Sequence, residues 1–323
     1  MTQNLCFTDW HSETGRGSGD VDGVCDGTPA AAAGGGDMND GLRTVEVGAC
    51  GAWPLPGDPT CASVARRTFR RVAGALALDP DVADDGMTMV SELAANTLHA
   101  RREQRQQGEQ RVVAPELWLY LRGGAGPNRQ LVCKVFDALP GWLEGNVPGH
   151  GLHRAPADAI SGRGLEVVHE LSHGRWGYHM TRARLGGWQV RGKAVWFAVP
   201  TSAPAVQAPQ APQAPPRVSA SAAMSQFEEA LAARGFAGQM LRADDPAEDM
   251  AVLSVCRGLS LWCCGDVAWL RAPGIGSSRW TYGDLVEVAE QAVEAYESLA
   301  DAAEPRAARK SRHAGRLAAP LSR

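Results

Sequence analysis

The chain has 323 residues, 44% of them hydrophobic, and a formal net charge of −4. The charge argues against a nucleic-acid binder, and the lack of any run of about 18 apolar residues argues against a membrane span. The eight cysteines include no Cys-x-x-Cys pair, which favours reduced thiols over a zinc site. The N-terminus also lacks a basic-then-apolar leader, so we expect a cytoplasmic protein that binds neither membrane nor nucleic acid.

Composition divides the sequence into five segments. The Gly/Ala-rich residues 1–44 are expected to be disordered, and residues 45–200 to form the main domain. Residues 201–219 alternate proline with Ala and Gln, which is typical of a stiff, extended linker. Residues 220–303 predict a small α+β unit of unknown role, followed by a disordered basic tail at 304–323.

Hydrophobic periodicity predicts helices and strands in both folded segments. In the main domain we expect helices at 59–78 and 82–107, strands at 112–122 and 130–137, a helix ending near 171, and strands beginning near 175 and 192. The glycine-rich stretch 142–161 is expected to be a lid or a disordered loop. In the small unit we expect a helix at 224–234, strands at 250–256, 260–264 and 268–271, and a helix at 282–301. No catalytic constellation is found in the small unit.

The second predicted helix carries an unusual polar stripe. Glu92, Asn96 and His99 lie at i, i+4 and i+7, so they share a narrow strip beside the apolar side of the helix. These side chains are placed either to look into a pocket or to form an ordinary solvated helix face. His99 is as well explained by packing or solvation as by a ligand contact.

A glycine-rich turn precedes the third predicted helix. Gly162-Arg163-Gly164-Leu165 would offer backbone N–H donors and the positive end of the helix dipole to an anion. The alternative is that the two glycines only satisfy a tight turn.

The joint order of these features resembles the ATP-binding domain of the GHKL superfamily, which includes gyrase and the histidine kinases. Within it, residues 45–200 are similar to the anti-sigma-factor serine kinases and to actinobacterial ATP-binding regulators. The matching features are Ser91-Glu92-Leu93-x-x-Asn96, Asp137 at the end of a hairpin, Gly162-Arg163-Gly164-Leu165, Trp176-Gly177 and Gly192-Lys193-x-Val195-Trp196. The resemblance implies an α+β two-layer sandwich, with a mixed, mostly antiparallel sheet covered by helices on one face.

The resemblance also implies roles for individual residues, with ATP and Mg²⁺ as cofactors. Asn96 matches the ligand that holds Mg²⁺ against the phosphates, and its amide oxygen is the hard type of donor that Mg²⁺ prefers. Glu92 matches the general base toward the attacking hydroxyl. Asp137 matches the acceptor of the adenine amino group. The remaining residues implied in nucleotide binding are Gly141, Gly162, Arg163, Gly164 and Leu165.

Two positions depart from the superfamily pattern. Leu139 stands where the first glycine of the Asp-x-Gly-x-Gly box is usual. Ala194 stands where a threonine is usual, which would remove a hydroxyl near Asp137.

The resemblance implies one function, and the altered glycine box at Leu139 suggests a second. The first is a serine/threonine kinase of the anti-sigma type that uses Mg-ATP. The second is a non-catalytic, nucleotide-dependent module that sequesters a sigma factor or another partner. In either case the partner is a protein, a sigma factor or an anti-sigma antagonist, and a homodimer is left open.

Overall fold

The computed structural model contains two antiparallel sheets, each packed against helices. It describes residues 48–106, 113–124, 128–138, 163–185, 187, 189–201, 218–272 and 276–303. All of these belong to one compact unit, Met38–Arg323. The expected N-terminal segment, the tail and nearly all of the linker lie outside the described residues. Within the described part, no helix combines the length and apolar character needed to cross a membrane.

The first sheet has the strand order β1-β2-β3-β5-β4. Its strands are β1 (Cys50–Pro54), β2 (Glu116–Arg122), β3 (Gln130–Asp137), β4 (Trp176–Arg182) and β5 (Arg191–Pro200). Every pairing between these strands is antiparallel, so the parallel component of the expected mixed sheet is not found among them. The predicted alternation in β2 is confirmed, because Leu117, Leu119 and Leu121 face one common core.

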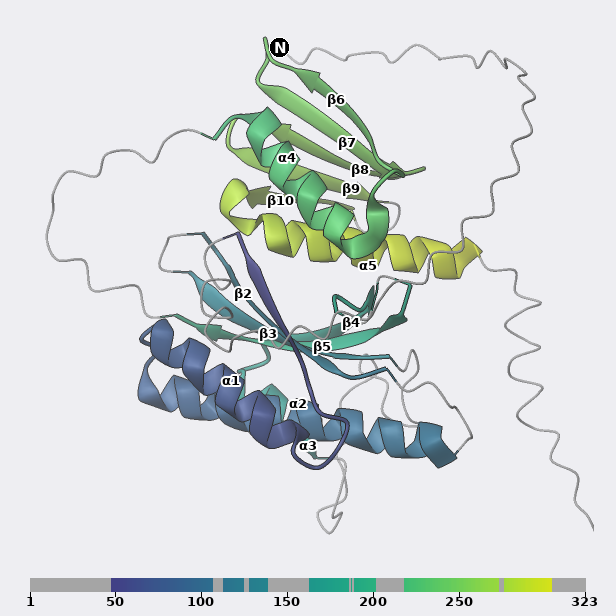
Figure 1. Cartoon of the computed structure of the whole chain (residues 1–323). Helices are drawn as coiled ribbons and strands as arrows, with labels where there is room; N and C mark the ends of the chain where they lie inside the picture. Colours follow the sequence, from purple (N-terminus) through teal and green to yellow (C-terminus); the bar gives the residue numbers. More distant parts are fainter. Residues whose placement is uncertain are drawn as a thin grey trace, which may run out of the picture. The chain divides into compact units, whose positions relative to one another are not determined.

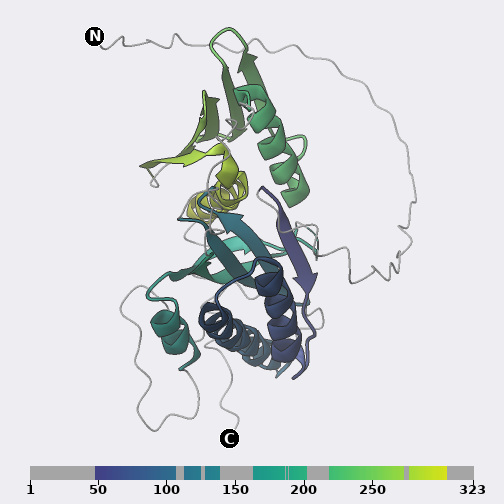
Figure 2. The same ribbon diagram turned by 90° about the vertical axis from the view of Figure 1, so that its left-hand side faces the viewer.

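Helices α1 (Cys61–Ala75), α2 (Pro80–Gln106) and α3 (Gly164–Leu171) pack on one face of this sheet (Figures 1 and 2). Asp79 caps α2 by accepting a hydrogen bond from the Asp81 backbone N–H at 2.9 Å. A Cβ on Gly86 of α2 would lie 2.3 Å from Cζ of Phe69 on α1, so glycine permits this close helix contact.

The second sheet has the order β10-β9-β8-β7-β6, an antiparallel meander. Its strands are β6 (Leu241–Asp245), β7 (Met250–Cys256), β8 (Leu259–Cys264), β9 (Val267–Ala272) and β10 (Gly276–Thr281). The helical elements beside it are α4 (Ala220–Leu231), η2 (Ala232–Phe236), η3 (Tyr282–Asp284) and α5 (Leu285–Ala303).

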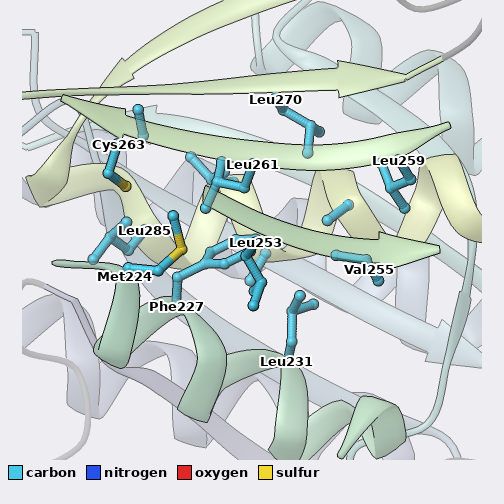
Figure 3. Packing of buried hydrophobic residues seen from close by; sticks show 14 of the residues in the cluster. Met224, Phe227, Leu231, Leu253, Val255, Leu259, Leu261, Cys263, Leu270 and Leu285 are labelled. Carbon is cyan, nitrogen blue, oxygen red and sulfur yellow. The ribbon is translucent and has the colours of Figure 1, made fainter. Parts of the chain in front are cut away.

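The second sheet buries an apolar core against α4 and α5. Figure 3 shows Leu253, Leu261 and Leu270 of three neighbouring strands on the side of Phe227 and Leu231 from α4. These five side chains are at most 2% exposed. The core explains why a segment of this size, without a disulfide among its described residues, forms a folded unit.

The α+β class is confirmed, and each predicted helix and strand matches an observed element. The predicted strands at 130–137 and 250–256 match in full, and most of the other elements have shifted ends. Two strands of the small unit, β6 and β10, were not predicted. β6 is Leu-Arg-Ala-Asp-Asp and mostly exposed, and both are edge strands, so neither carries a strong apolar alternation.

Candidate functional site

The polar residues of α2 converge on the first residue of α3. A Cβ built on Gly164 would lie 2.8 Å from Oε2 of Glu92, 3.4 Å from Nδ2 of Asn96 and 3.5 Å from its Oδ1. Glu92 is half-buried and Asn96 is exposed, so both can meet a ligand from solvent. Glycine at position 164 therefore lets a carboxylate and an amide approach the N-terminus of a helix closely.

The start of α3 supplies backbone donors beside these two side chains. Arg163 occupies the N-cap position and is exposed, and no side-chain hydrogen bond caps the helix. Leu165 packs partly buried against the apolar core, so its side chain anchors α3. Its backbone remains part of the helix N-terminus, where the dipole favours an anion.

Asp137 is the last residue of β3. Its side chain lies on the face of the sheet that the helices cover, because alternate residues of a strand share a face and Cys133 and Val135 belong to that core. Lys193 of β5 is its register partner, and Lys193 Nζ lies 2.9 Å from Oδ2 of Asp137. Both side chains are less than a tenth exposed. A nucleobase amino group would therefore share the Asp137 carboxylate with Lys193. Lys193 was not predicted as a site residue, although it lies in the Gly192-Lys193 motif.

The remaining residues expected near the site are either outside the described part of the chain or on the other face of the sheet. Gly141, Gly162 and Leu139 lie outside the described residues, as does the side chain of His99. Ala194 packs with Trp118, Phe136 and Ala183 on the opposite face of the sheet from Asp137. The expected loss of a hydroxyl beside Asp137 is therefore wrong, because the side chain of residue 194 points away from it.

The opposite face of the first sheet holds a second cluster, made of charged residues that meet α5. Glu290 of α5 is 1% exposed. Its carboxylate lies 2.7 Å from Nη2 of Arg184, 3.4 Å from Nζ of Lys134 and 3.4 Å from Nε of Arg234. One buried carboxylate thus forms ion pairs with three cations.

Two further glutamates of α5 continue this contact. Glu297 accepts hydrogen bonds from the guanidinium groups of Arg182 and Arg191. Glu287 accepts a hydrogen bond from the Tyr120 hydroxyl at 2.5 Å and lies 3.6 Å from Nη1 of Arg122. The carboxylate stripe of α5 is therefore matched by cations along its length.

The aromatic part of this cluster is Trp118 of β2. The guanidinium carbons of Arg184 and Arg234 lie 5.3 Å and 4.9 Å from its ring centroid. Its Nε1 donates to Oε2 of Glu116 at 2.8 Å, and Arg234 donates to Oγ1 of Thr181 at 2.8 Å. The fully buried Arg234 thus joins the small unit to both β2 and β4.

Burial and charge shift the pKa values in this cluster. Burial raises the pKa of Glu290, but Arg234, Lys134 and Arg184 outweigh it and hold the pKa well below its usual range. Burial, aided by Lys134, lowers the pKa of His179 to about 3. His179 is therefore neutral at physiological pH, and its Nε2 lies 3.0 Å from Nζ of Lys134.

No protein-family model matches this chain, and no curated protein matches it. The described residues also contain no group of three or more His, Cys, Asp or Glu that could hold a metal ion. A Mg²⁺ ion at Asn96 would therefore need oxygen ligands from phosphate and water, which is its usual mode of binding to nucleotide enzymes.

Proposed function

We propose that this chain is an Mg-ATP-dependent regulatory protein of the cytoplasm that phosphorylates a serine or threonine on a protein partner. The supporting observation is the convergence of Glu92 and Asn96 on Gly164 at the N-terminus of α3. A carboxylate base, an amide metal ligand and the backbone N–H donors of a helix N-terminus, brought together, are the parts that phosphoryl transfer needs.

Each residue has a defined task in this proposal. Bound Mg-ATP would supply the transferable γ-phosphoryl group and the charge that neutralises it. Asn96 offers its Oδ1 to the metal, and the start of α3 binds phosphate oxygens through backbone N–H groups. Asp137, fixed by Lys193, accepts a hydrogen bond from the adenine amino group.

The chemical step needs one base. The partner's hydroxyl oxygen bonds to the γ-phosphorus while the bond from that phosphorus to the β,γ-bridging oxygen breaks, and ADP leaves. Glu92 accepts the hydroxyl proton on its carboxylate. The partner would be an anti-sigma antagonist or a sigma factor.

Phosphoryl transfer from radiolabelled γ-phosphate ATP to candidate antagonists tests the proposal. We expect Glu92→Gln to lower kcat by about two to four orders of magnitude, because the base is lost while the metal ligand stays. The matched control is Glu229→Gln, which changes an exposed carboxylate of α4. Absence of transfer to every partner, or equal transfer by Glu92→Gln, would contradict kinase activity.

A second function rests on Leu139 and on the engagement of Asp137 by Lys193. Here the chain binds nucleotide without transferring phosphate and sequesters its partner. Binding of Mg-ATP with neither hydrolysis nor transfer would favour this function over the first.

A further inference from the structure

Helix α5 buries two faces of different chemistry. One face places Leu285, Val288 and Val293 in the apolar core of the second sheet. The other presents Val286 to Tyr120, Val132 and Ala198 of the first sheet, beside a stripe of carboxylates. The first face belongs to the small unit's own fold, and the second is its contact with the main domain.

The second face is dominated by charge. Glu287, Glu290 and Glu297 lie at i, i+3 and i+10, so they project on one side of the helix. They meet five cations of the first sheet and its flanking segment, with Arg234 as a sixth. The five are Arg122, Lys134, Arg182, Arg184 and Arg191.

A contact made of ion pairs is specific, but it contributes little net free energy to the association of α5 with the first sheet. Each buried ion loses its hydration, and the attraction to its partner offsets that cost only when the geometry is good. Charge pairs therefore fix the register and reject wrong partners more than they add affinity. The apolar contact through Val286 is small by comparison.

The covalent connection makes a weak contact sufficient. Residues 202–217 join β5 to α4 in the sequence, so α5 meets the first sheet as part of the same chain and its docking is intramolecular. α5 can therefore occupy the sheet face in cis with an affinity that another helix could match.

We propose that the basic face, formed by Arg122, Lys134, Arg182, Arg184 and Arg191, is a docking site for an acidic helix. α5 is its resident occupant, and a partner protein that presents carboxylates at the same spacing displaces it. This site lies on the opposite face of the sheet from Asp137 and does not depend on nucleotide binding.

Exchange between nicked chains tests the proposal on the full sequence. A protease site is placed within residues 202–217, so that cleavage gives an N-terminal half with the first sheet and a C-terminal half with the second sheet and α5. Isotope-labelled and unlabelled chains are cleaved and mixed. The C-terminal half of the second copy then serves as the acidic-helix probe, and native mass spectrometry detects hybrid complexes. We expect the halves to remain associated in low salt and to form hybrids. High salt should weaken the association only in part, because Glu290 and Glu297 are buried whereas the Arg191 side chain is 37% exposed.

The carboxylates are tested by Glu290→Gln combined with Glu297→Gln. We expect the dissociation constant of the halves to rise at least about thirtyfold, because buried cations lose their counter-charges. Glu229→Gln should leave it unchanged, and circular dichroism checks that each variant is folded. Halves that never exchange, halves that separate already in low salt, or halves indifferent to the double substitution would each overturn the proposal.

Discussion

The two faces of the first sheet are covered through different interactions: apolar packing on one face and ion pairs on the other. Leu119 and Val135 face helices α1 to α3 through apolar contacts, whereas Trp118 and Lys134 on the same strands face the charged side of α5. Apolar burial is non-directional and scales with area, so it supplies stability. Ion pairs are directional and costly to desolvate, so they supply register and specificity. The sheet thus has one face that holds the domain together and one that recognises a helix.

The largest effect is expected on the apolar face. Phe197→Ala should lower the free energy of unfolding by about 4 kcal/mol, because a fully buried ring beside Phe69 is replaced by a cavity. Urea unfolding measures it, and the loss should be the same in low and high salt. Leu185→Ala is the control, since Leu185 is 50% exposed and should change stability little. A strong salt dependence of the Phe197 effect would contradict the contrast between the faces.

Glu290→Gln should have the next largest effect, about 3 kcal/mol in low salt. The substitution leaves Lys134, Arg184 and Arg234 without their shared carboxylate. The difference from the unmodified chain, as read from urea midpoints, should change little in high salt, because salt screens buried charges much less than exposed ones. A loss as small as that of the exposed control Glu229→Gln would show that the ion pairs do not form.

The pH dependence on the acidic side should come in part from His179. Its pKa falls from 6.5 to about 3 on folding, so the unfolded chain binds the extra proton between these values. Stability is therefore highest above pH 6.5 and decreases as the pH falls, by about 2 kcal/mol at about pH 5. His179→Asn should flatten this slope in urea titrations, while the exposed His173→Asn should keep it. An unchanged slope in His179→Asn would refute the assignment.

The smallest effect on stability is expected at Gly164. Gly164→Ala places a methyl group 2.8 Å from Oε2 of Glu92, which must rotate, but alanine favours the helix, so the net change should stay under about 1 kcal/mol. Affinity for Mg-ATP should fall at least about tenfold, because the methyl group fills the proposed phosphate space. Gly74 of α1 is exposed, and a Cβ there meets no neighbouring atom, so Gly74→Ala should stabilise the chain slightly without changing affinity. Equal nucleotide affinity in Gly164→Ala would place the ligand elsewhere.

Local patterns predicted one face of the sheet and missed the other. The Leu117, Leu119 and Leu121 alternation and the Glu92–Asn96 spacing are visible within a few residues, so the helix-covered face and its polar stripe were predictable. The contact of Tyr120 with Glu287 joins positions 167 apart, and no local periodicity shows it. The spacing of Glu287, Glu290 and Glu297 was the available signal, but only a helix at 282–301 was predicted there, with no role for its carboxylates. The pairing of Asp137 with Lys193 likewise needed the β3–β5 register, which hydrophobic alternation does not specify across a long connection.

Calorimetric titration of Mg-ATP tests the central claim most directly. The proposal predicts one binding site on the full chain and at least about tenfold weaker binding to Asn96→Ala, because the metal loses its protein ligand. Gln226 is an exposed residue of α4, and the Gln226→Ala variant should bind Mg-ATP with the affinity of the unmodified chain. Absence of binding by the unmodified chain, or equal affinity in Asn96→Ala, would contradict a nucleotide site at Glu92, Asn96 and Gly164.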